Sequence, residues 1–187
     1  MSQKPSISQA FKRIVQDTET AIIADKSINW GYLPKKITFM SGNFMEINAR
    51  ILEMTNSTLP EISNGKYPLV ALFKDIKETL TEGPIGIESS FKCKFAILTL
   101  TTPDYRHDER EAINFKPVLI PILEQMLKQF QQSAQFGMPT IQQMNVQATD
   151  CYFYGTGFNQ DNKNPFSDYV DAIEVESISL NIKNLNC

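Results

Sequence analysis

The stretch Tyr67-Pro-Leu-Val-Ala-Leu-Phe73 decides the fold of this chain. Apolar side chains occupy both sets of alternating positions in it, a pattern typical of a strand that is covered on both faces. Pro68 lacks the amide proton that a strand ladder needs, so the strand is expected to begin there. The next apolar run, Phe91-Lys-Cys-Lys-Phe-Ala-Ile-Leu98, alternates with lysines at first and is apolar throughout at its end. Together the two runs predict a hairpin with a long connection.

Working outward from this hairpin, apolar residues at helical spacing predict three helices, over residues 6–24, 44–52 and 108–132. Two prolines, Pro117 and Pro121, lie inside the third segment. Each deletes a helical hydrogen bond, so a kink or a break is expected near them.

Further strands are expected over residues 35–40, 150–154 and 170–182, the last with a bulge or bend beyond Ser177, where the apolar set changes phase. The chain has neither internal repeats nor a linker long enough to divide it. We therefore predict one α+β domain over residues 1–187, with an antiparallel or mixed sheet of four to five strands packed against two or three helices in the order α-α-β-β-α-β-β. Long loops are expected at 55–66, 78–90, 131–148 and 155–169.

Composition excludes several broad classes. With 187 residues, 42% of them hydrophobic and 21% charged, the chain can bury a core and is not disordered over most of its length. It has no run of about 18 apolar residues, so neither a membrane span nor a membrane partner is expected. Eighteen basic and twenty-one acidic side chains give a net charge of −3, which disfavours a binder of duplex nucleic acid.

Residue types that bind metals or act as nucleophiles are scarce. His107 is the only histidine, and the three cysteines, Cys93, Cys151 and Cys187, are far apart in sequence. No zinc-type spacing is present, so no metal and no cofactor are expected. The N-terminus lacks the apolar segment of a signal peptide, which favours a reducing compartment and free thiols.

A catalytic site is difficult to assemble from these residues, and no enzyme activity is expected. His107 lies in a highly charged stretch that is more typical of a solvated helix start, and no nucleophile turn accompanies it. Asp75, Lys77 and Asp104 resemble the acids and lysine of a metal-dependent nuclease, but in reversed chain order. A nuclease or an accessory protein of nucleic-acid processing is therefore kept as the alternative from another class.

Three features favour assembly over chemistry. The predicted helix over 108–132 is apolar on more than one side, the strand over 67–73 is apolar on both faces, and the loops are long. Surplus apolar surface is typical of an oligomeric structural subunit. The alternative is a monomer whose small core uses these residues.

Four stretches carry a resemblance to a known family: Lys66-Tyr-Pro-Leu-Val-Ala-Leu-Phe73, Phe95-Ala-Ile-Leu-Thr-Leu-Thr-Thr102, Phe115-Lys-Pro-Val-Leu-Ile-Pro-Ile122 and Asp168-Tyr-Val-Asp-Ala-Ile-Glu-Val-Glu-Ser-Ile-Ser-Leu-Asn-Ile182. They resemble the small structural proteins encoded by tailed phages and prophages of Bacteroidota-type hosts. Over about residues 40–182, the order helix, hairpin, helix, strands is similar to that of tail terminator (tail completion) or head–tail joining proteins. A small structural module of a contractile or injection-type tail is a further hypothesis of the same class.

The resemblance implies a homo-oligomeric ring, commonly hexameric, in the virion, assembled in the cytoplasm of the bacterial host. Such a ring caps the last ring of the tail tube, docks on neck and connector proteins, and lets DNA pass through its lumen without specific binding. Exposure guessed from the sequence places the contacts in the loops 78–90 and 155–169 and in the helix-start cluster 104–110. The residues expected at these contacts are Asp104, Arg106, Arg110, Phe158, Phe166 and Tyr169.

Overall fold

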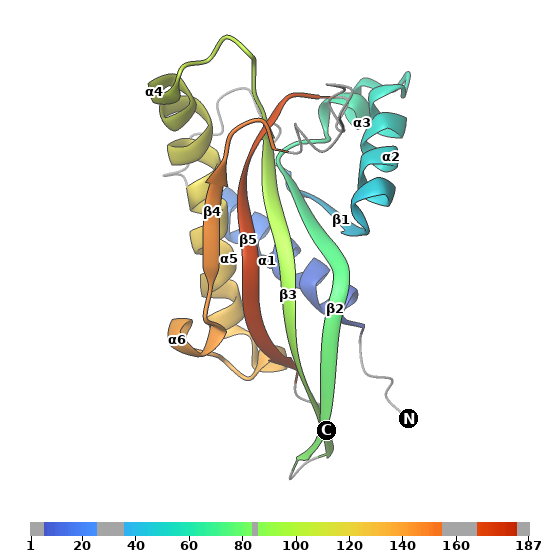
Figure 1. Cartoon of the computed structure of the whole chain (residues 1–187), viewed down its shortest axis with the longest axis vertical. Coiled ribbons are helices and arrows are strands. Elements are labelled where there is room, and N and C mark those ends of the chain that lie inside the picture. The colour runs from blue at the N-terminus through green and yellow to red at the C-terminus, as the bar shows by residue number, and fades with distance from the viewer. Residues whose placement is uncertain (1–5, 26–35, 84–85, 155–167, 183–187) are drawn as a thin grey trace.

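The computed structural model describes residues 6–25, 36–83, 86–154 and 168–182, and its fold is α+β, as predicted. A mixed sheet of order β1-β2-β3-β5-β4 carries helices on both faces (Figure 1). The strands are β1 Thr38–Gly42, β2 Leu69–Gly83, β3 Gly86–Leu100, β4 Gln147–Cys151 and β5 Val170–Ile182. The helices are α1 Ile7–Ala24, α2 Phe44–Thr55, α3 Pro60–Asn64, α4 His107–Arg110, the π-helix η1 Glu111–Leu119, α5 Ile120–Gln132, the 3₁₀ helix η2 Ala134–Phe136 and α6 Ile141–Met144. None of the helices in these described ranges is long and apolar enough to cross a membrane.

The β2–β3 hairpin is much longer than predicted. Its two 15-residue strands pair from Leu69 opposite Leu98 down to Gly83 opposite Gly86, so the predicted loop over 78–90 is wrong. A sequence pattern indicates a strand through its buried face, whereas most β2 side chains beyond Phe73 are exposed on both faces. Cross-strand pairing stabilises this part of the hairpin instead. Figure 1 shows it reaching past the helices at the lower end of the molecule.

Two other predicted loops contain secondary structure. Residues 55–66 include α3, and residues 131–148 include η2, α6 and the first residues of β4. β4 itself begins three residues earlier than the strand predicted over 150–154. Of the loop predicted over 155–169, residues 155–167 lie outside the described residues.

The upper half of the sheet, as drawn in Figure 1, is buried on both faces, which confirms the prediction for residues 67–73. One face, which we call the helix face, packs against α1 and α5 (Figure 1). Its core includes Phe11, Val70, Leu72, Phe95, Met126 and Phe130. Phe11 is central, because its ring centroid lies 5.2 Å from that of Phe95 and 5.3 Å from that of Phe130.

The opposite face, which we call the groove face, is covered by α2 in its upper half only. Ile47 and Ile51 of α2 pack there against Leu69, Ala71 and Leu98. α2 starts sharply after β1, because the side chain of Asn43 accepts a hydrogen bond from the amide of Glu46 at 2.9 Å and the Glu46 carboxylate accepts one from the Asn43 amide.

The predicted helix over 108–132 is α4, η1 and α5 in succession. The expected irregularity is present, because Pro117 lies inside the π-helix and Pro121 lies in the first turn of α5. Its apolar side chains are largely used by the core, since only Ile113 is notably exposed, at 45%. The buried ones are Val118, Leu119, Ile122, Met126 and Phe130. The surplus apolar surface expected on this helix is therefore wrong for most of its residues.

The bend predicted beyond Ser177 is a β-bulge. Cys93 pairs with Ile178 and Phe95 pairs with Val175, so β5 has one more residue than β3 between the two pairs. The pairing of β4 with β5 skips Glu176 as well. The extra residue explains why the apolar set of β5 changes phase there.

Candidate functional site

The structure brings several of the predicted contact residues to one end of the sheet but buries one of them. Asp104 and Arg106 are exposed in the turn before α4, and Tyr169 is 47% exposed just before β5. Arg110 is only 2% exposed, so its predicted place on a contact surface is wrong. Phe158 and Phe166 lie outside the described residues.

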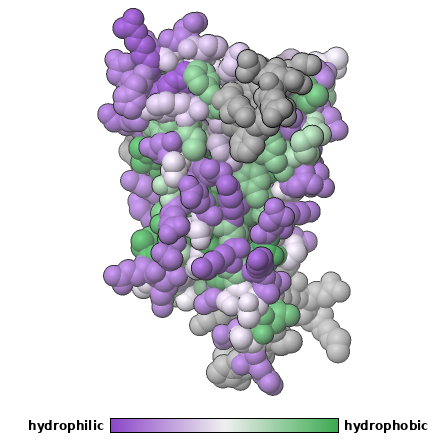
Figure 2. All heavy atoms as spheres, viewed as in Figure 1, coloured by the Kyte–Doolittle hydropathy of each residue, from purple (hydrophilic) through white to green (hydrophobic). Residues whose placement is uncertain are grey.

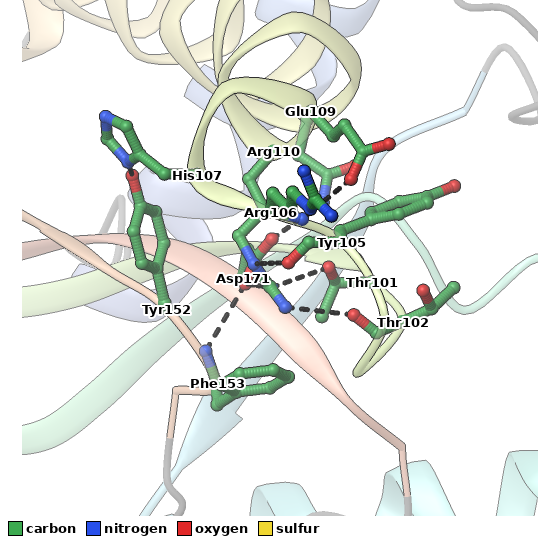
Figure 3. A network of polar contacts seen from close by, with 11 residues as sticks. Thr101, Thr102, Tyr105, Arg106, His107, Glu109, Arg110, Tyr152, Phe153 and Asp171 are labelled. Atoms are coloured by element: carbon green, nitrogen blue, oxygen red, sulfur yellow. Dashed lines mark hydrogen bonds and ion pairs between the residues drawn. The ribbon is translucent and has the colours of Figure 1, made fainter.

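Arg110 is the centre of a buried polar network (Figure 3). Its Nη1 donates to the carboxylate of Asp171 at 2.6 Å and to the hydroxyl of Thr101 at 2.8 Å. Nε donates to the carbonyl of Tyr105 at 3.0 Å, and Nη2 donates to the carbonyl of Thr102 at 2.9 Å. Four bonds from one guanidinium tie the start of the helix to the turn after β3 and to β5.

Asp171 is equally well satisfied from its other sides. Asn114 of η1 donates to Oδ2 at 2.7 Å, and the backbone amide of Phe153 donates to Oδ1 at 3.3 Å. Phe153 adopts a φ of +48°, in the left-handed region that a phenylalanine rarely occupies. This backbone turn carries the Phe153 ring over the guanidinium of Arg110, whose Cζ lies 4.1 Å from the ring centroid.

Aromatic side chains extend the network toward the surface. Tyr152 lies with its ring centroid 5.5 Å from Arg110 Cζ, and its hydroxyl contacts Nδ1 of His107 (Figure 3). Desolvation, followed by the charges of Glu111 and Asp150, raises the pKa of the Tyr152 phenol. Tyr169 meets Phe153 edge-on at 5.9 Å between ring centroids. The predicted contact residues Arg110 and Tyr169 are thus linked through the ring of Phe153.

The burial of this network and its protein partners give it a structural role. Arg110 and Asp171 form an ion pair with side-chain exposures of 3% and 0%, and their hydrogen-bonding groups face protein partners. A buried pair of this kind is costly to break, because the remaining charge is left uncompensated. Its role is to fix helix α4–η1 and residues 152–153 against the upper end of β3 and β5.

The three residues of the nuclease hypothesis do not meet. Leu69 pairs with Leu98, close to the end of β3 that leads to Asp104. Asp75 lies six residues further along β2, in the direction away from that end. At about 3.4 Å per residue, Asp75 is roughly 20 Å along the strand from Leu69 alone. Within the residues that the structure describes, no group of three metal-ligating side chains is found. The geometry therefore gives this hypothesis no shared site.

An open groove of about 580 Å³ lies on the lower half of the groove face. Its lining is mostly polar and comes from β2, β3 and β5: Asp75, Lys77, Thr79, Ser90, Lys92, Lys94, Glu176, Ser177, Ser179 and Asn181. Lys77 and Lys92 are directly opposite each other, while Lys94 is paired with Glu174 at 2.7 Å. Figure 2 shows hydrophilic side chains over the middle and lower part of this face. Opposite charges and hydroxyls in an open groove give a surface that water can wet.

The thiol of Cys93, beside this groove, is expected to be unreactive. Cys93 is 3% exposed, and burial raises its pKa to about 12, so the reactive thiolate is absent near neutral pH. The cysteine therefore contributes packing on the helix face of β3 rather than chemistry in the groove.

Two unpaired strand edges are the features that sequence reasoning missed. β1 pairs with β2 only as far as Phe73, so residues 74–83 of β2, which we call the free segment, have no strand on their outer side within the described part of the chain. Among the strands that the structure describes, β4 pairs only with β5, and its residues 147–150 are all exposed. Two strand-favouring threonines at alternate positions, Thr79 and Thr81, were the available signal for the first edge.

No family model matches this chain, and no curated protein matches it with significance.

Proposed function

We propose that this chain is a structural subunit without enzymatic activity that builds a ring at the head–tail junction or tail end of a tailed-phage virion. The phage setting rests on the resemblance over about residues 40–182 to tail terminator and head–tail joining proteins. In this setting the partners are other copies of the chain, the tail-tube protein and the neck or connector proteins.

The observation that carries the proposal is the pair of unpaired strand edges. A closed ring needs a head-to-tail contact, in which each subunit offers two different surfaces. The free segment of β2 and the exposed edge of β4 lie on opposite sides of the sheet. Exposed backbone amides and carbonyls on such edges are ready partners for another strand.

The groove face supports passage of DNA rather than its binding. A lumen that lets DNA slide must not hold phosphates with an excess of lysine or arginine. Acids offset the lysines of this face: Lys94 pairs with Glu174, and Asp75 and Glu176 line the same groove as Lys77 and Lys92. A net charge of −3 for the chain is compatible with the same role.

Light scattering on the purified protein, with negative-stain imaging of the same sample, tests the proposal. We expect particles several times the 21.3 kDa of one chain, with a central hole, that co-sediment with the tail-tube protein of the same phage. A protein that stays monomeric at high concentration and does not co-sediment with the tail-tube protein would refute the proposed function.

A further inference from the structure

We infer that neighbouring copies join through their sheets, with β4 of one copy pairing antiparallel with the free segment of β2 in the next. This inference rests on the proposed ring and names the surface that closes it. The occupant of each edge is a second copy of this chain.

The direction of the pairing follows from the strand directions. β2 and β5 both run antiparallel to β3, and β4 runs antiparallel to β5. β4 therefore runs opposite to β2. Rotation about a ring axis keeps the direction of every strand relative to that axis, so β4 and the next copy's β2 meet antiparallel. Antiparallel pairing is the slightly more stable form per residue.

The two edges are offset by the amount that a closed sheet requires. Thr149 in the middle of β4 and Lys77 in the free segment both point to the groove face, so they can lie directly opposite each other. Thr149 is level with Ala96 through Glu174, whereas Lys77 pairs with Lys92, four residues away along β3. The offset is therefore about 14 Å along the strands, over a width of about 19 Å for the four strands from β2 to β4. This slope corresponds to a strand tilt of about 35°, at the lower end of the range of roughly 35–45° found in closed barrels.

The direction of the offset between the two edges also determines which face of the sheet points toward the ring axis. Figure 1 shows the groove face in front, with β4 toward the left and the lower part of the β2–β3 hairpin at the right. With this face toward the ring axis, the strands coil in the right-handed sense that sheet twist favours. Six copies would then enclose a space about 45 Å across between backbones.

Charges on the two edges are complementary. Lys74 and Lys77 are exposed at the start of the free segment, and neither forms an ion pair in the described part of the chain. On the β4 edge, Asp150 is exposed beside Glu111, and burial together with that neighbouring charge raises its pKa. Alternation along the strands places Lys74 on the helix face together with Asp150, whereas Lys77 lines the groove face. Lys74 brought next to these crowded acids relieves the repulsion, which disfavours pairing of two β4 edges with each other.

Exposed apolar side chains flank both edges. On the β1–β2 side they come from α2 and α3, and on the β4 side from η1 and the segment around α6 (Figure 1). The first group is Met45, Leu52, Leu59 and Ile62, and the second is Ile113, Met138 and Ile141. Because α2 packs on the groove face whereas η1 and α6 pack on the helix face, the two patches do not meet across the junction, and the junction rests on the strand edges themselves.

Cysteine cross-linking tests the junction. The test protein carries Thr149→Cys and Lys77→Cys in a Cys151→Ser, Cys187→Ser background and is treated with a short bismaleimide, which bridges opposite and diagonal neighbours in a strand pair. Within one chain the two positions are three strands apart, out of reach of the reagent. We expect a ladder of covalent oligomers that ends at the copy number of the ring.

Matched controls separate the junction from other contacts. A mixture of the two single-cysteine proteins should give covalent dimers and nothing larger, because each chain then has one reactive edge. Pairing Lys77→Cys with Gln16→Cys, an exposed position on α1, should give monomers. Rings on the grid without a ladder would overturn the inference and leave the proposed function standing, whereas absence of rings would overturn both.

Hydrogen exchange of the unmodified chain gives a second test. Amides in peptides covering 74–83 and 147–151 should exchange about tenfold more slowly, or slower still, in rings than in dissociated subunits, while those of central strand β3 change little. Rings that leave both edges unprotected would contradict the junction.

Discussion

Replacing Asp171 by asparagine tests whether the buried Arg110 network stabilises the fold. The substitution keeps the size of the side chain but removes the charge that faces Arg110 Nη1 at 2.6 Å. Because the guanidinium is almost fully buried, solvent does not compensate it. Removing one member of such a pair typically costs about 3–5 kcal/mol.

Urea unfolding followed by circular dichroism measures this effect. With an m-value of about 2 kcal/mol/M, a loss of about 4 kcal/mol lowers the unfolding midpoint by about 2 M. Arg110→Gln should act similarly, and the double variant should cost at least about 1 kcal/mol less than the two single costs added together, because the partners are coupled.

Glu174→Gln is the matched control, since it removes the same charge from the Lys94 pair, whose lysine is 48% exposed. Screening by water limits that loss to about 1 kcal/mol or less. The buried ion pair would not stabilise the fold in this way if Asp171→Asn and Glu174→Gln lowered the unfolding midpoint equally. The same conclusion would follow if the losses of unfolding free energy for the Asp171 and Arg110 variants simply added.

Three further outcomes are expected. Iodoacetamide at pH 8 should modify Cys93 only after unfolding, because burial raises its pKa to about 12, whereas partly exposed Cys151 should react in the native state, as read by peptide mass. Burial raises the pKa values of the Tyr67 and Tyr154 phenols above their ordinary range, so their contribution to stability is complete below about pH 10 and is lost as the pH rises further; absorbance at alkaline pH should show these phenols ionising together with unfolding. Asn43→Ala should cost about 1 kcal/mol in urea unfolding through loss of the α2 cap, and a cost near zero would contradict the capping geometry.

The buried part of the sheet could be predicted because its residues carry a period. Residues 67–73 are apolar in both phases and lie between two cores, and the phase change at Ser177 indicated the β5 bulge. The lower hairpin could not be predicted in the same way. Residues 78–82 are exposed on both faces, so they form a strand through pairing with β3, which leaves little trace in a hydrophobic pattern.

Arg110 shows why the site was harder to predict than the fold. Its neighbours Asp104, Arg106 and Glu109 are exposed, so a charged stretch before a helix indicated a solvated surface. The partner that buries it, Asp171, is 61 residues away in sequence, and no local pattern connects the two. Burial of a charge depends on such distant partners, which is why the sequence indicated the cluster but not the orientation of its central residue.

The charged side chains of the free segment matter for the subunit before it assembles. Lys74, Asp75, Lys77, Glu78 and Glu82 make this edge a poor template for indiscriminate strand addition, because an incoming strand must match both signs of charge. These charges therefore disfavour aggregation through this edge in a subunit that has not yet assembled, although its hairpin is already extended. In the proposed ring, assembly then depends on local concentration and on a matching edge.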